Sequence, residues 1–515
     1  MTTQRTRAAA TRVLLDYGAI GLVFVKGLVL VPLYLSHFSL ACYGAWLASG
    51  SILAVLGLVE GGFTLVFAQR LSLSAGARDD HRFATEAFAG AVVLCTMAVA
   101  ATGAGIAFGP LASRAFRLEE GERASLEIAL RFGAAALGLT FVQTIFASIW
   151  DAWQLPHVGG VSRIGGQVCE IVTTVVLLRS GAGLASLPIG AAAGTTFVCV
   201  LTGSLLPREW ARRGLHYPGL SLPTVLGIAN ECAPMFVSKV ASVAVNNNEP
   251  LLAATLVGAE SAAVLGLTDR VFKLGQMVIN VGALSIYFAI CHLRGERGAQ
   301  DGRLESALRT ISRFGGIAIA ALVAMLIAGN KGFVSCWVGP QNFGGIALST
   351  TLGVASAVAV RVNLAGLMLS AAGGTRESAL SQLLELVVRL PLLWVCIHLF
   401  GVIGIPVASL VTTTFLLGPM YVFYTARILG AQVVRRSFLL GDAAVPFALI
   451  LSSGVCFAWI LPDSHGWLKF AGHATVIFIT IGVSSIATAF CFLDALELRQ
   501  PLNWFRSLRT NDRRR

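Results

Sequence analysis

Charged residues are scarce in this chain. Asp, Glu, Lys and Arg make up 12% of its 515 residues, whereas about 25% is usual for a soluble domain. Hydrophobic residues make up 56% of the sequence. A chain with so few charges cannot cover a water-exposed surface, so the composition excludes an ordinary soluble globular protein.

The sequence also lacks the patterns that hold metals and nucleotides. Its ten Cys are scattered singly through apolar runs without a CxxC pair, and its eight His do not fall at metal-ligand spacing. A GxxxxGK[ST] motif for nucleotide phosphates is absent. We therefore expect no metal site, no cofactor and no ATP hydrolysis.

Long apolar runs dominate what remains, and their length matches the roughly 20 residues that cross the hydrocarbon of a bilayer. The sequence predicts an all-α polytopic membrane protein of about fourteen transmembrane helices. The predicted spans are 13–36, 43–68, 84–110, 125–150, 161–180, 184–206, 223–248, 262–291, 305–329, 345–371, 377–400, 403–426, 441–461 and 467–494.

Lys and Arg are unevenly distributed between the two sets of loops. They concentrate in the N-terminus, in the loops after even-numbered spans and in the tail "RSLRTNDRRR", whereas the other loops carry few. By the positive-inside rule, both termini are predicted to be cytoplasmic. The net charge of +12 is then a consequence of topology, with membrane lipids as neighbours and no nucleic-acid partner.

Two of the predicted inner loops resemble each other. "SAGARDDHRFATE" follows the second span and "ERGAQDGRLESAL" follows the eighth, and both place Gly-Ala-x-Asp ahead of an Arg. A parallel repeat of six helices would explain this spacing. We expect an N-terminal six-helix lobe over 1–206, a second lobe over 207–426, and two additional helices with a basic tail over 427–515.

Several charged residues fall inside the predicted spans, where a charge that faces lipid costs roughly 2.5 to 3.5 kcal/mol. Asp269 with Lys273 and Glu385 with Arg389 are spaced i, i+4, so each pair can neutralise itself on its own helix. Four cations on four spans have no such neighbour: Lys26, Lys239, Arg270 and Arg361.

Polar residues line one face of two spans. Glu231, Ser238, Ser242, Asn246 and Glu249 share a face of the seventh, and Ser378, Gln382, Glu385 and Arg389 share a face of the eleventh. Arg and Lys are the usual partners of phosphate. An aqueous cavity that receives an anion therefore explains the unpaired cations, while a packed helix interface explains the paired ones.

The segment "ACYGAWLASGSILAVLGLVEGGFTLVFAQRLS" resembles the second helix of Wzx-type bacterial polysaccharide flippases, within the multidrug/oligosaccharidyl-lipid/polysaccharide exporter superfamily. The likeness consists of Tyr43, Gly44 and Trp46, then an acidic residue with Gly, Glu60-Gly61-Gly62, ahead of the basic Arg70. The family commonly has Asp followed by Leu-Gly at that acid, so this chain departs from the pattern at Glu60. "VGAESAAVLGLTDRVFKL" is similar to the family's eighth helix.

This resemblance implies two six-helix lobes, two extra helices and a V-shaped cavity. The implied activity moves a polyprenyl-diphosphate-linked oligosaccharide across the bacterial inner membrane, with polysaccharide polymerase and chain-length proteins as partners. The candidate substrate-binding residues are then Lys26, Lys239, Arg270, Lys273, Arg361, Arg389 and Asn246. Glu60, Glu231 and Asp269 are the candidate acids for ion coupling or for positioning a cation.

Other functions stay open. A cation-coupled multidrug exporter and a peptidoglycan-precursor flippase belong to the same superfamily. A membrane glycosyltransferase or polysaccharide polymerase is a different class, but such enzymes carry catalytic residues on a large outer loop, and the longest outer segment here has about fifteen residues. We expect a transporter and not an enzyme.

Overall fold

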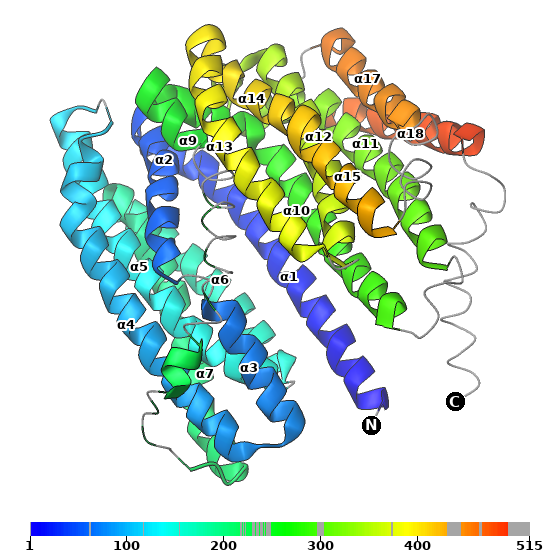
Figure 1. Cartoon of the computed structure of the whole chain (residues 1–515). Helices are drawn as coiled ribbons and strands as arrows, with labels where there is room; N and C mark the ends of the chain where they lie inside the picture. Colours follow the sequence, from blue (N-terminus) through cyan, green and yellow to red (C-terminus); the bar gives the residue numbers. More distant parts are fainter. Residues whose placement is uncertain are drawn as a thin grey trace. The chain divides into compact units, whose positions relative to one another are not determined.

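The computed structural model describes residues 2–60, 63–116, 118–153, 155–216, 249–295, 303–371, 374–429, 444–462 and 466–492, and scattered positions between 219 and 243. Every regular element within these residues is a helix (Figure 1). The chain divides into two compact units, Met1–Ala263 and Val264–Arg515. Each unit is described by itself below.

Unit 1 is a bundle of long helices. Its elements are α1 (Thr2–Leu35), α2 (Leu40–Leu56), a 3-10 turn (Gly57–Glu60), α3 (Phe63–Ala77), α4 (Asp80–Ser113), α5 (Glu120–Ala152), α6 (Pro156–Arg179), α7 (Ser186–Arg212), α9 (Glu249–Leu252) and a π turn (Ala253–Val257). Helix α5 packs between α4 and α7, and α6 packs against both α7 and α1 (Figure 1). The 3-10 turn at Glu60 interrupts the predicted second span.

Local chemistry determines where some of these helices begin. The Ser39 side chain accepts a hydrogen bond from the backbone N–H of Cys42 at the start of α2, and Asp79 does the same for Arg82 at the start of α4. These caps satisfy backbone donors that the first helical turn leaves free. The core of the unit is rich in aromatic rings, with Phe83 stacked on Trp153 at 5.5 Å between ring centroids.

Gly44 allows a close approach within unit 1. A Cβ atom at this position would lie 1.8 Å from the backbone oxygen of Ala259, in the first turn of α10 (Ala259–Gly295). Only a residue without a side chain lets the two backbones come this close. The Tyr-Gly-x-Trp motif of the sequence therefore has a packing role at the start of α2.

Unit 2 contains most of α10, followed by α11 (Arg303–Trp337), α12 (Gly345–Ala371), α13 (Thr375–Phe400), α14 (Gly404–Thr412), a π turn (Thr413–Leu417), α15 (Gly418–Leu429), α17 (Ala444–Ile460) and α18 (Trp467–Phe492). Helix α11 contacts α12, α17 and α18, while α13 packs on α14 (Figure 1). Short π turns of this kind add a residue to a helix and often occur near functional sites.

The helices have the length and composition of membrane spans. Nine of the described helical segments are long and apolar enough to cross a bilayer, and Gly21–Leu35 and Ala444–Ile460 are shorter apolar helices. Large hydrophobic side chains such as Leu468 and Phe478 are exposed on the bundle surface, as expected where lipid replaces water. The chain is a multi-pass, all-α membrane protein.

The structure confirms most of the predicted spans. Each one except the seventh coincides with a helix or with helical segments that continue one another. The seventh, 223–248, lies mostly outside the described residues. The lobe limits 1–206, 207–426 and 427–515 stay predictions.

Candidate functional site

Lys26 forms an ion pair across two helices of unit 1. Its Nζ atom on α1 donates a hydrogen bond to Glu170 Oε2 on α6 at 3.0 Å. The side chains are 22% and 19% exposed, so the pair is only partly withdrawn from its surroundings. Lys26 has no acid at i, i+4 spacing, but the expectation that it is unpaired is wrong, because its partner comes from a helix distant in sequence.

Helix α10 carries one paired cation and one without a described partner. Lys273 lies 3.2 Å from Asp269, which confirms the predicted i, i+4 pair, and the Lys273 side chain is 51% exposed while Asp269 is buried. Arg270 has no ion pair or hydrogen bond with any residue that the structure describes, and its Nε is buried. A guanidinium offers five donors and keeps its charge, so Arg270 retains capacity for an anion.

Polar side chains hold this part of α10 in place within unit 2. The Asn330 amide on α11 donates to the Thr268 backbone oxygen at 3.0 Å and to Ser349 Oγ on α12 at 2.8 Å. About two turns further along α10, Gln276 donates to Ser356 Oγ on α12 at 2.7 Å. These bonds fix the backbone on both sides of Arg270.

The predicted polar face of α13 is packed inside unit 2. Arg389 lies 3.3 Å from Glu385 and donates to Ser409 Oγ on α14 at 3.0 Å, and both charged residues are nearly fully buried. Tyr421 on α15 is buried close to Gln382 and Ser378 of the same face. The predicted Glu385–Arg389 pair is therefore confirmed, and it packs against other helices of unit 2.

The remaining candidates differ in what surrounds them. Glu60 is buried at the 3-10 turn and accepts a hydrogen bond from the backbone N–H of Thr64 at 3.2 Å. Arg361 on α12 stacks on the ring of Phe447 on α17, with its guanidinium carbon 4.9 Å from the ring centroid.

Three candidates lie outside the described residues, together with most of their polar face: Glu231, Lys239 and Asn246. Within the part of the chain that is described, no group of three His, Cys, Asp or Glu residues could hold a metal ion.

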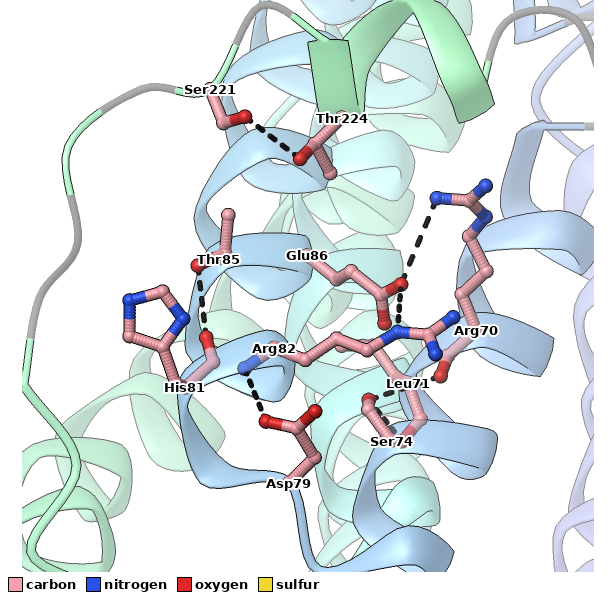
Figure 2. Close-up of polar contacts among 10 residues, drawn as sticks. All are labelled: Arg70, Leu71, Ser74, Asp79, His81, Arg82, Thr85, Glu86, Ser221 and Thr224. Atoms are coloured by element: carbon pink, nitrogen blue, oxygen red, sulfur yellow. Dashed lines mark hydrogen bonds and ion pairs between the residues drawn. The ribbon is translucent and has the colours of Figure 1, made fainter.

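One charged cluster was missed by the sequence reasoning. Glu86 on α4 is 3% exposed at its side chain, and one of its oxygens lies 3.1 Å from Arg82 Nε and 3.7 Å from Arg70 Nη1 on α3 (Figure 2). Asp79 caps the backbone of Arg82 in the same cluster. The i, i+4 spacing of Arg82 and Glu86 could have revealed half of this cluster. The contact with Arg70 required the fold.

Several solved structures share this fold. An inward-facing multidrug resistance MATE family transporter of the MOP superfamily matches with a TM-score of 0.67 and 14% identity, over 80% of this chain and 95% of that one. Lipid II flippase MurJ in an inward closed conformation matches with a TM-score of 0.65 and 13% identity, over 92% of this chain and 98% of that one.

A MOP superfamily transporter from Pyrococcus furiosus also matches, with a TM-score of 0.55 and 15% identity, over 80% of this chain and 96% of that one. No protein-family model and no curated protein sequence matches the chain. At these identities the likeness concerns architecture. The chain has the fold of MOP superfamily transporters.

Proposed function

We propose that this chain is a transporter of the MOP superfamily that flips a polyprenyl-diphosphate-linked oligosaccharide across a bacterial inner membrane for surface polysaccharide assembly. Its fold is that of solved transporters, one of which is a lipid II flippase. Its helices span a membrane, and its sequence carries cations within the spans. These cations are suited to bind the diphosphate that joins the glycan to its lipid.

The observation that carries the proposal is the environment of Arg270. It lies on a helix whose backbone is tied to α11 and α12, it has no described acid partner, and its neighbour Lys273 extends from the same helix with half its side chain exposed. Arg binds phosphate through two parallel hydrogen bonds, while Lys acts as a point charge. We assign the diphosphate to Arg270 and Lys273.

The other candidate residues have secondary roles in this proposal. Lys26 and Arg389 are held by Glu170 and Glu385, so an anion must compete with a carboxylate for each of them. Lys239 and Asn246 keep their proposed roles in contacting phosphate and sugar. Glu60, Glu231 and Asp269 are the acids proposed for ion coupling or for positioning a cation, and Asp269 positions Lys273.

A cation-coupled small-molecule exporter is the second candidate. Several of the matching structures are MATE transporters, which favours this alternative at the level of fold. The two functions differ in what Arg270 should do. A diphosphate requires the positive charge, whereas a cationic drug is repelled by it.

The test is complementation of cells from which the gene is deleted. With Arg270→Ala we expect surface polysaccharide to fall and the lipid-linked oligosaccharide to accumulate, because lost charge-assisted hydrogen bonds weaken binding about tenfold or more. Arg270→Lys should keep part of the activity. Arg212→Ala is the control, since that Arg is 72% exposed and paired with Glu209.

Normal glycan export by Arg270→Ala would contradict the proposal, provided that membrane abundance is unchanged. Loss of export together with loss of the protein from the membrane would make Arg270 a structural residue, which also contradicts the role proposed for it.

A further inference from the structure

Arg361 lies where three helices of unit 2 meet. Its guanidinium carbon is 4.9 Å from the centroid of the Phe447 ring on α17. On the opposite helix α11, a Cβ atom at Gly316 would lie 2.0 Å from Arg361 Nη1. The guanidinium therefore occupies a notch that α11 leaves open because residue 316 has no side chain.

The positive charge of Arg361 is incompletely satisfied. Nη1 is buried without a hydrogen-bond partner, and Arg361 makes no ion pair with any residue in the described part of the chain. The Phe447 ring attracts the cation, but cation–π attraction offsets only part of the cost of removing a charge from water.

Arg361 lies on a helix that is long and apolar enough to cross a membrane, Gly345–Ser370. Its guanidinium faces two neighbouring helices of unit 2, α11 and α17. Basic pockets between transmembrane helices bind the phosphate-bearing head groups of lipids.

We propose that Arg361, seated in the Gly316 notch and covered by Phe447, binds the phosphate group of a lipid. The ligand class is a lipid phosphodiester or diphosphate, which accepts the paired N–H donors that a guanidinium presents. Two sources carry this chemistry, a bilayer phospholipid and a prenyl diphosphate. The inference extends the proposed function by adding a site between α11, α12 and α17, and it does not depend on the glycan.

Two variants remove the site in different ways. Arg361→Gln removes the charge. Gly316→Ala leaves the charge in place, but its Cβ would collide with Nη1, so the flexible Arg side chain must leave the notch. Gly329→Ala is the matched control, because a Cβ atom at this other position of α11 meets nothing within 4 Å.

The experiment measures lipid binding to the purified full-length protein by native mass spectrometry in detergent. The probes are dioleoylphosphatidylglycerol, farnesyl diphosphate and, as a phosphate-free lipid, dioleoylglycerol. We expect Arg361→Gln and Gly316→Ala to bind the phosphate-bearing probes about tenfold more weakly than the wild type, with Gly329→Ala unchanged. Binding of dioleoylglycerol should be the same in all four proteins.

The relative affinities identify the source of the phosphate. Tighter binding of phosphatidylglycerol assigns the site to bilayer lipid, and tighter binding of farnesyl diphosphate assigns it to a prenyl carrier. Equal binding of both probes by the wild type, Arg361→Gln and Gly316→Ala would overturn the site. If Arg361→Gln does not fold, Gly316→Ala decides, since it keeps the charge. None of the probes contains a glycan, so this result is independent of the export phenotype of Arg270→Ala.

Discussion

At the scale of single residues, the described candidate cations differ in whether a carboxylate holds them. Lys26 and Arg389 lie 3.0 Å from Glu170 and 3.3 Å from Glu385 respectively, and these pairs stabilise helix packing. Lys273 is also paired, at 3.2 Å from Asp269, but half of its side chain is exposed. Arg270 and Arg361 have no such partner among the residues that the structure describes, so they are available to an anion from outside the chain.

Separating Lys26 from Glu170 should destabilise unit 1. We expect Lys26→Met or Glu170→Leu alone to cost about 2 kcal/mol, less than the 3–5 kcal/mol typical of a fully buried pair, because both side chains keep about a fifth of their exposure. The double variant should recover most of this loss, since no charge is left alone. Thermal unfolding in detergent measures the effect.

The double variant is the decisive comparison for this pair. A double variant no more stable than the worse single variant would mean that the two side chains are not energetically coupled.

At the scale of helices, the contact between α2 and the start of α10 depends on Gly44. The backbone oxygen of Ala259 occupies the space that a side chain at residue 44 would need. Helix backbones cannot yield as a flexible side chain can. The two helices are therefore held at a distance that no other residue permits.

Gly44→Ala should push these helices apart and destabilise unit 1 by about 1–3 kcal/mol, the usual range for overpacking. Gly50→Ala on the same helix is the control, because its Cβ atom would meet nothing within 4 Å and Ala favours a helix over Gly. Thermal unfolding and membrane abundance measure both variants. Equal stability of the two variants would contradict the close approach.

The helices themselves could be predicted because a membrane span needs only length and apolar composition. Their interruptions do not follow from length and apolar composition: the 3-10 turn at Glu60 and the π turn over Thr413–Leu417 both fall inside predicted spans. The same limit applies to charges. Spacing on one helix predicted Asp269 with Lys273, but Lys26 with Glu170 depends on helices that are 144 residues apart in sequence.

At the scale of the whole molecule, topology follows from the distribution of Lys and Arg. Reporter fusions after Arg82, Arg213, Arg303 and Arg436 should all report the cytoplasm, because these loops carry the basic excess. Fusions in the loops after Phe38 and Val338 should report the opposite side. An outer location at two of the first four positions would contradict the predicted topology and the parallel repeat.

The fold by itself does not select a cargo, since solved transporters of this architecture include a multidrug resistance transporter and a lipid II flippase. The type of substrate must therefore be inferred from individual residues of this chain. Arg270 and Lys273 on α10 favour an anion.

Translocation by the purified protein in liposomes tests this account most directly. The substrate is a prenyl-diphosphate-linked oligosaccharide with a fluorescent label on the sugar, and a membrane-impermeant quencher reports the leaflet that each molecule occupies. We predict transfer between leaflets by the wild type and by Arg212→Ala, and transfer about tenfold slower by Arg270→Ala. Transfer no faster than in protein-free liposomes, or equal rates for wild type and Arg270→Ala, would contradict the account.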